Sequence, residues 1–268
     1  MADAFFVATS ATVSRQFRHF QPTEHVVGPW NPAHMHGGPP SALLAHSIAQ
    51  QTAGQVIPDP GFICRMTVEI LKPVPVADVE ITTRIVRPGR RIALVDAAMS
   101  AGGETVMLAR AWFIRTASID VPATRQPAPP PMGEALAAVP DSWGSGYLQA
   151  IDWREVSGTF AEPGPATAWT RSRYPLVEGC ELTGIERVML VADSGNGLSS
   201  AADPSQLIFV NPELTVHLLR PPDGDWIWMS AETFLDPRGV GLATTTLGDR
   251  TGQLGIGNQS LFVAPTRR

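Results

Sequence analysis

Apolar and polar residues alternate with a period of two along several segments of the chain, which is the spacing of side chains on one face of a β-strand. Such alternating sets are Met66, Val68 and Ile70; Val79, Ile81, Thr83 and Ile85; Ile92, Leu94, Asp96 and Ala98; and Trp226 and Trp228, which alternate with Ile227 and Met229. The mixed pattern predicts strands of a curved antiparallel sheet that packs one face on a helix.

A first helix is expected from about Gly38 to about Gln51. Pro39 and Pro40 suit the first turn of a helix, because the N–H that proline lacks has no intrahelical partner there. Gly54 then supplies a residue type that commonly ends a helix.

A second helix has a clearer start. Thr183 and Glu186 fit a capping box, in which each side chain binds the backbone N–H of the other residue. The apolar residues that follow recur at helical spacing and give the helix one apolar face: Ile185, Val188, Met189 and Ala192. Gly195 is expected to end this helix.

The chain also contains an internal repeat. Residues 66–73 read Met-Thr-Val-Glu-Ile-Leu-Lys-Pro, and residues 214–221 read Leu-Thr-Val-His-Leu-Leu-Arg-Pro. A β-rich stretch with two turns follows each copy. Such a repeat predicts two copies of one small α+β unit, each with one helix and several strands.

A proline-rich stretch separates the two copies. Residues 127 and 129–131 are all proline, which can neither pair inside a sheet nor continue a helix, so we expect an extended linker. The first unit should then cover residues 1–118, the linker 119–145 and the second unit 146–268. One long helix wrapped by an antiparallel sheet, twice over, is the double hotdog architecture. Pairing the two sheets edge to edge would remove an exposed edge.

Composition sets only broad limits on function. The 268 residues are 44% hydrophobic, which supports a real core, and the net charge of −5 gives no reason to expect a nucleic-acid partner. No apolar run approaches the roughly 20 residues of a membrane span, and no basic segment precedes the apolar start as in a signal peptide. Cys64 and Cys180 fit two buried thiols in a reducing compartment. We therefore expect a cytoplasmic protein.

Four short motifs, in this order and spacing, resemble the acyl-CoA thioesterase II family, and more closely its actinobacterial thioesterase-like branch. They are Gly37-Gly38 at the start of the first helix, Arg87-Pro-Gly-Arg90, Asn211-Pro-Glu-Leu-Thr-Val-His-Leu-Leu-Arg-Pro221 and Gly257-Asn-Gln-Ser260. The resemblance covers almost the whole chain. It implies hydrolysis of a fatty or other acyl-CoA, with no cofactor besides the CoA part of the substrate.

The resemblance also implies a set of site residues. In the family, an aspartate late in the second helix, a serine or threonine at the start of the following strand and a glutamine on the last strand hold the attacking water. Asp193 matches the aspartate, Gln259 matches the glutamine, and Asn211 stands where the hydroxyl residue is expected. An asparagine side chain can hydrogen-bond a water both as donor and as acceptor.

The residues themselves support this choice. The C-terminal end of a helix disfavours negative charge, so a carboxylate at Asp193 should tend toward a useful general base. When the repeats are aligned, Ile63 lies opposite Asn211, and Ala111 or a neighbour lies opposite Gln259. The first helix contains no carboxylate. The polar triplet therefore exists only in the second half of the chain.

Further residues are candidates for contact with the substrate. Gly37 and Gly38 begin a helix, where free backbone N–H groups can stabilise an oxyanion and a thioester carbonyl can approach closely. His36 adjoins them. Glu213, two residues after Asn211, is the main rival for the general base, and Arg90 belongs to an arginine cluster that could meet the CoA phosphates.

Other functions are weighed against this one. His34 and His36 have no acidic ligand near them in sequence, so we expect no metal, and no Gly-x-Ser-x-Gly or P-loop element is present. A non-catalytic acyl-CoA or lipid-binding protein stays open because of Asn211. A hotdog enoyl-CoA hydratase also stays open, although such enzymes pair a histidine with an acid on the helix and the second helix has no histidine. We expect a homodimer or higher homo-oligomer of double hotdogs.

Overall fold

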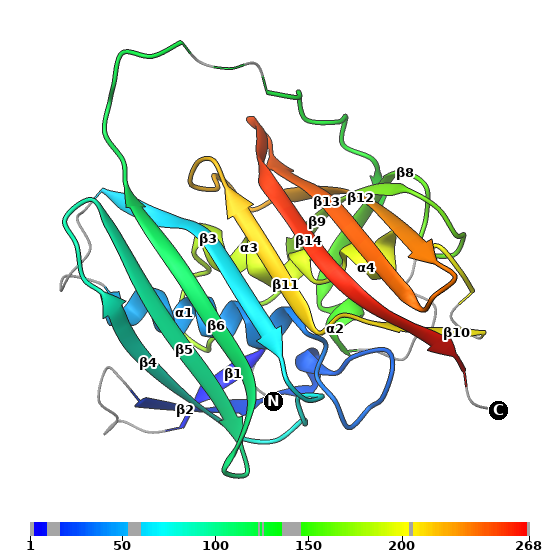
Figure 1. Ribbon diagram of the computed structural model, residues 1–268, viewed down its shortest axis with the longest axis horizontal. Coiled ribbons are helices and arrows are strands. Elements are labelled where there is room, and N and C mark those ends of the chain that lie inside the picture. The colour runs from blue at the N-terminus through cyan, green and yellow to red at the C-terminus, as the bar shows by residue number, and fades with distance from the viewer. Residues whose placement is uncertain are drawn as a thin grey trace.

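The structure is a computed structural model, and it describes residues 3–9, 17–52, 60–122, 124, 126–135, 146–203 and 206–266. Its first half folds as one main helix against a layer of strands (Figure 1). In chain order the elements are β1 (Phe6–Ala8), β2 (Phe17–Pro22), a 3-10 helix (Glu24–Val26), α1 (Gly38–Thr52), β3 (Gly61–Ile70), β4 (Val79–Arg87), β5 (Ile92–Ala101) and β6 (Glu104–Arg115).

The second half repeats this plan with two additional short helices. Its elements are β7 (Glu134–Ala135), α2 (Gly146–Gln149), β8 (Ile151–Ser157), β9 (Ala166–Ser172), α3 (Gly184–Ala192), α4 (Gly195–Leu198), β10 (Leu207–Val210), β11 (Glu213–Leu218), β12 (Ile227–Asp236), β13 (Val240–Asp249) and β14 (Gly252–Pro265). Among the described residues, the strands form a single antiparallel sheet of 14 strands.

Both helix predictions are confirmed at their starts. Helix α1 begins at Gly38, while Gly54 lies outside the described residues. Helix α3 has the expected capping box, in which the Thr183 N–H donates to Glu186 Oε2 over 2.9 Å. Its predicted end was wrong by three residues: α3 stops at Ala192, and Gly195 begins α4 instead.

The two halves join through the repeated segment itself. Strands β3 and β11 lie side by side in the middle of the sheet (Figure 1), and Thr67 pairs directly with Thr215. Val68 pairs with Leu214, and Met66 pairs with Val216. Because equivalent residues of the two copies exchange across this pair, an approximate two-fold axis passes between the threonines, whose Oγ1 atoms are 3.1 Å apart. This confirms the double hotdog with its sheets paired edge to edge.

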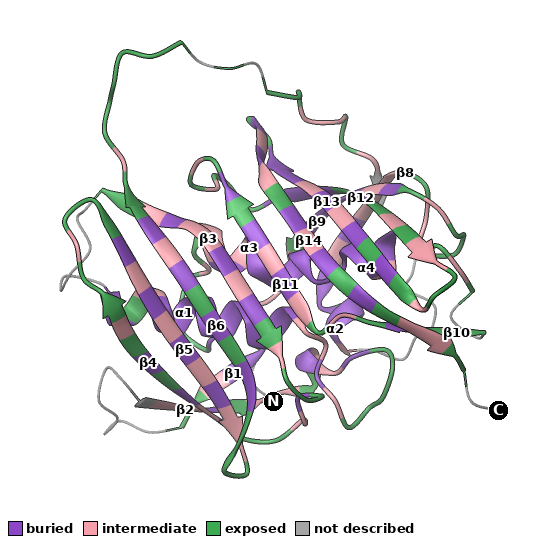
Figure 2. Ribbon diagram, in the orientation of Figure 1, coloured by how far each residue is buried: buried purple, intermediate pink, exposed green. Residues whose placement is uncertain are grey.

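The core lies between this sheet and the helices, which cover one face of it (Figure 1). Burial alternates along the central strands, as Figure 2 shows, because every second side chain points toward the helices. Helix α1 packs against both the sheet and α3, so Leu43, Leu44 and Ile48 are completely buried. Each such side chain contributes about 1.5–3 kcal/mol relative to an exposed one.

The described part of the connection between the halves runs around the molecule rather than through it (Figure 1). Strand β6 ends at Arg115 and α2 begins at Gly146, while residues 136–145 of the predicted linker lie outside the described residues. Midway along the linker the chain touches the second half, where Trp169 Nε1 donates to the Pro131 carbonyl over 3.3 Å. At the other end of the chain, β1 reaches across the halves, since Phe6 bridges Val177.

Two further sequence expectations concern the thiols and the membrane. Cys64 and Cys180 are both unpaired, but only Cys64 is partly buried, because Cys180 lies in an exposed turn before α3. The expectation that both are buried was therefore wrong. Over the part of the chain that the structure describes, none of the helices has the length and apolar character needed to cross a bilayer.

Candidate active site

Asp193, Asn211 and Gln259 come together at the end of α3. Asn211 Nδ2 donates to Asp193 Oδ1 over 2.8 Å, and Gln259 Nε2 donates to the same oxygen over 3.3 Å. Asp193 is only 6% exposed and Gln259 only 1%. A buried carboxylate is costly without hydrogen bonds, and these two neutral amides supply them.

The local chain path explains how this cluster is held. Asp193 is the C-cap residue of α3 rather than part of its last turn. Gln259 on β14 also donates to the Asp193 carbonyl over 3.1 Å, and its Oε1 accepts the Asn196 N–H over 3.1 Å. The Gln259 amide therefore bonds to the carboxylate and the carbonyl of Asp193 and to the Asn196 N–H, so Gln259 fixes Asp193 in place.

Asn211 lies at the break between β10 and β11, where Pro212 interrupts the strand. Its Nδ2 reaches both Asp193 Oδ1 and the Glu213 carbonyl, the latter over 3.3 Å. Both amide hydrogens thus have acceptors. The amide oxygen of Asn211 has no partner among the described residues and can accept a hydrogen bond from a ligand or water.

The start of α1 closes the other side of the cluster. Gly37 approaches Asp193 so closely that a Cβ atom added there would lie 2.5 Å from Asp193 Oδ2. Gly38 packs in the same way against the Leu190 carbonyl of α3. The two glycines are therefore required for this close approach of the N-terminus of α1 to the C-terminus of α3.

His36 and Tyr147 complete the site. The imidazole of His36 stacks on the Tyr147 ring at 3.8 Å between centroids and 8° between planes. Its Nδ1 accepts the Gly38 N–H over 3.0 Å and lies 3.6 Å from Asp193 Oδ2. Burial lowers the pKa of His36, and the nearby Asp193 charge only partly opposes this.

Tyr147 is a residue that sequence reasoning missed. It is fully buried, and its hydroxyl contacts Ser194 Oγ over 2.8 Å and donates to the Leu190 carbonyl over 3.0 Å. Burial, the largest cause, also raises the pKa of this phenol. The only local signal for Tyr147 is an aromatic residue in a glycine-rich turn, which does not reveal a partner in the other half.

A cavity of about 530 Å³ leads to this cluster. Its inner end contains His36, Gly37, Asp193 and Asn211, and its walls are largely apolar. The apolar lining comes from three loops and strand ends: Trp30, Met35, Ile70, Leu71, Pro73, Val74, Ile208, Phe209, Val210, Pro212 and Phe262. A concave apolar site with a few convergent polar groups is the usual form of a small-molecule site.

Two predicted contact residues lie elsewhere. The Glu213 carboxylate accepts from the Ser260 N–H over 2.7 Å and from Thr215 Oγ1 over 3.1 Å, and it does not line the cavity. Arg90 lies in the turn between β4 and β5. That turn is at the Phe62 end of β3, and the cavity is at the Ile70 end, about 30 Å away along the strand.

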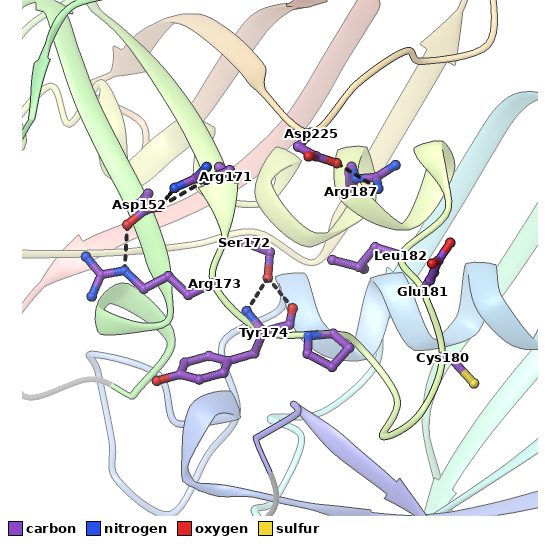
Figure 3. A pocket seen from close by; sticks show the side chains of 11 residues that line it. Asp152, Arg171, Ser172, Arg173, Tyr174, Cys180, Glu181, Leu182, Arg187 and Asp225 are labelled. Atoms are coloured by element: carbon purple, nitrogen blue, oxygen red, sulfur yellow. Dashed lines mark hydrogen bonds and ion pairs between the residues drawn. The ribbon is translucent and has the colours of Figure 1, made fainter.

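A second hollow, of about 770 Å³, lies at the opposite end of α3 (Figure 3). It is polar, but its arginines are already paired, as the dashed lines show. Asp152 binds Arg171 over 2.6 Å and Arg173 over 2.7 Å, while Arg187 binds Asp225 over 3.0 Å. Because these arginines are paired with aspartates of the same hollow and Asp193 lies at the other end of α3, this hollow is not the candidate site.

The fold and the cavity define a double hotdog protein whose cavity is lined by the buried carboxylate of Asp193 and by residues of both halves. Models of the acyl-CoA thioesterase N-terminal domain and of the acyl-CoA thioesterase C-terminal domain match residues 26–114 and 122–263. The chain therefore belongs to the acyl-CoA thioesterase family and is an acyl-CoA thioester hydrolase.

Solved structures share the fold over nearly the full chain. A hot dog fold protein of unknown function from Alicyclobacillus acidocaldarius superimposes with a TM-score of 0.73 at 16% identity, covering 99% of this chain and 98% of that one. Acyl-CoA thioesterase II TesB2 from Mycobacterium marinum gives 0.69 at 13% identity, covering 97% and 95%. A candidate thioesterase from Novosphingobium aromaticivorans DSM 12444 gives 0.74 at 19% identity, covering 96% and 98%. A comparison with curated proteins finds no match.

Proposed function

We propose that this chain hydrolyses acyl-CoA by direct attack of a water molecule that Asp193 activates. The observation that carries the proposal is that the two carboxylate oxygens of Asp193 differ in their hydrogen bonds. Asp193 Oδ1 accepts from Asn211 and Gln259. Among the described residues no N–H or O–H donates to Asp193 Oδ2, which lies 3.6 Å from His36 Nδ1, and Asp193 lines the cavity. Oδ2 is therefore the oxygen available to a water.

The attacking water has two groups to orient it. One of its protons points to Asp193 Oδ2 and the other to the free amide oxygen of Asn211. As the water oxygen bonds to the thioester carbon, Asp193 Oδ2 takes the first proton and the carbonyl oxygen becomes an anion. The carbon–sulfur bond then breaks, and the CoA sulfur leaves with the proton that Asp193 returns. Gln259 does not touch the water in this scheme and acts as a positioning residue.

In this scheme the thioester carbonyl oxygen of the substrate binds at the N-terminus of α1. The Gly37 N–H has no acceptor among the described residues, and the helix N-terminus adds positive potential there. The largely apolar walls suit the acyl chain of the substrate. The cavity volume is also within the range of about 300–1,000 Å³ typical of small-molecule sites.

The test measures release of free CoA thiol from acyl-CoAs of varied chain length. Asp193→Asn keeps the size of the side chain and removes the base, so kcat should fall by about 10²–10⁴. Asp120→Asn, an exposed carboxylate in the linker, is the matched control and should leave kcat unchanged.

Three outcomes would reject the proposal. If the Asp193→Asn variant keeps a kcat within a few-fold of the wild type, Asp193 is not the general base. Tight acyl-CoA binding without thiol release would indicate a carrier. Hydration of an enoyl-CoA in place of thiol release would indicate a hydratase.

A further inference from the structure

The protonation of the His36 ring is decided by its hydrogen bonds. Nδ1 accepts the Gly38 N–H over 3.0 Å, so it presents a lone pair and carries no hydrogen. A neutral imidazole with a bare Nδ1 must carry its hydrogen on Nε2. This N–H has no protein acceptor among the described residues, and His36 lines the cavity.

The surroundings of His36 favour this neutral form. Its side chain is 11% exposed and lies flat on the buried Tyr147 ring. The carboxylate oxygen nearest to it, Asp193 Oδ2, is 3.6 Å from Nδ1 and is too far away for a good hydrogen bond. The ring is therefore held by a backbone N–H on one side and by stacking on one face.

The start of α1 is unusually poor in free donors. A helix normally offers several unpaired N–H groups at its N-terminus. Here the Gly38 N–H is used by His36, Pro39 and Pro40 have none, and the Ser41 N–H binds the Gly37 carbonyl over 3.2 Å. Among the N–H groups of residues 37–41, only that of Gly37 has no acceptor in the described part of the chain, whereas an oxyanion is usually held by more than one donor.

We propose that the Nε2–H of neutral His36 is the second donor to the thioester carbonyl, beside the Gly37 N–H, and that Tyr147 is the positioning residue for this ring. This inference rests on the proposed hydrolysis. Both donors keep their protons throughout, because the proton of the attacking water goes to Asp193 and then to the leaving sulfur. His36 thus stabilises charge without acting as an acid or a base.

Activity measurements with three variants test the donor. His36→Ala should lower kcat by about 10²–10³ with a smaller change in KM, as for loss of one oxyanion donor. His36→Asn should do the same, because its shorter amide stops near the position of Nδ1. His36→Gln places an N–H near the position of Nε2, so its kcat should be at least tenfold higher than that of His36→Ala.

A second measurement reads the tautomer directly. In the wild type, ¹⁵N NMR of the His36 ring should show hydrogen on Nε2 and none on Nδ1 around neutral pH. The Tyr147→Phe variant keeps the stacked ring and should keep this spectrum, whereas Tyr147→Leu should broaden or shift it.

Two results would overturn the inference: a His36 ring with hydrogen on Nδ1, or a His36→Ala variant with kcat within threefold of the wild type. If Asp193→Asn abolishes thiol release while His36→Ala does not, only the role of His36 is lost. If Asp193→Asn stays active, the proposed function itself fails.

Discussion

Asn211 offers the sharpest test of the water site, because a single side chain there has two separate roles. Its Nδ2 donates to Asp193 Oδ1 over 2.8 Å, and its free oxygen faces the water. Asn211→Leu removes both groups at nearly constant volume. A hydrogen bond to a charged group contributes about 1.5–3 kcal/mol. Since each 1.36 kcal/mol changes a rate tenfold, losing this bond alone should lower kcat roughly 10-fold to 150-fold.

Asn211→Thr is the matched replacement. A threonine hydroxyl can donate to Asp193 and accept from water with one oxygen, so this variant should stay within about tenfold of the wild type and well above the leucine variant. The assay is release of free CoA thiol under single-turnover conditions, with thermal unfolding of both variants as the control for folding. A leucine variant that keeps more than a third of the wild-type rate, or a threonine variant slower than leucine, would contradict the proposed role.

Two further predictions concern close packing and acid stability. Gly37→Ala should lower kcat about 10²-fold, because the added Cβ would displace Asp193 Oδ2. Gly197→Ala is the control, because a Cβ atom there would meet open space. Equal kcat values for the two variants would refute the argument. For Asp249, burial is the largest single influence and raises the pKa, but the hydrogen bonds from Arg220, Thr251 and the Asp223 N–H together outweigh it and lower the pKa from 3.8 to about 2. The carboxylate therefore stabilises the fold above about pH 4, by about 2 kcal/mol, and this contribution is lost as the pH falls toward 2. Asp249→Asn should reduce the free energy of unfolding at pH 7 but much less at pH 2.5, and a pH-independent difference would exclude this explanation.

Much of the fold was predictable because its signals are local or repeated. The capping box at Thr183 fixes the start of α3, and the prolines after Gly38 fix the start of α1. The repeat predicted two units paired edge to edge but not which strands would meet. In the structure the two copies of the repeated strand pair about a two-fold axis, as Thr67 and Thr215 do. These features depend on residues close in sequence or on the symmetry of the chain.

The site was only partly predictable because its remaining contacts are long-range. Asn211 and Glu213 were expected on one face of a strand, but Pro212 breaks the strand between them, so Glu213 points to Ser260 instead. The order of the hairpins in the sequence could have predicted that Arg90 lies far from the cavity. Successive hairpin turns of an antiparallel sheet lie at opposite ends, and the β5–β6 turn is the one near the cavity.

The duplicated fold also explains why one of two equivalent places holds the site. The approximate two-fold axis gives each helix N-terminus a neighbouring helix C-terminus. At α3 the N-terminus is closed by its own capping box, because Glu186 accepts the Thr183 N–H and its other oxygen binds His46 of α1 over 2.9 Å. A carboxylate of the chain thus occupies the position where an oxyanion would bind. At α1 no side chain of the described residues accepts the Gly37 N–H, so this donor stays available to a ligand. The capping difference between the helices therefore selects the end at which Asp193 lies.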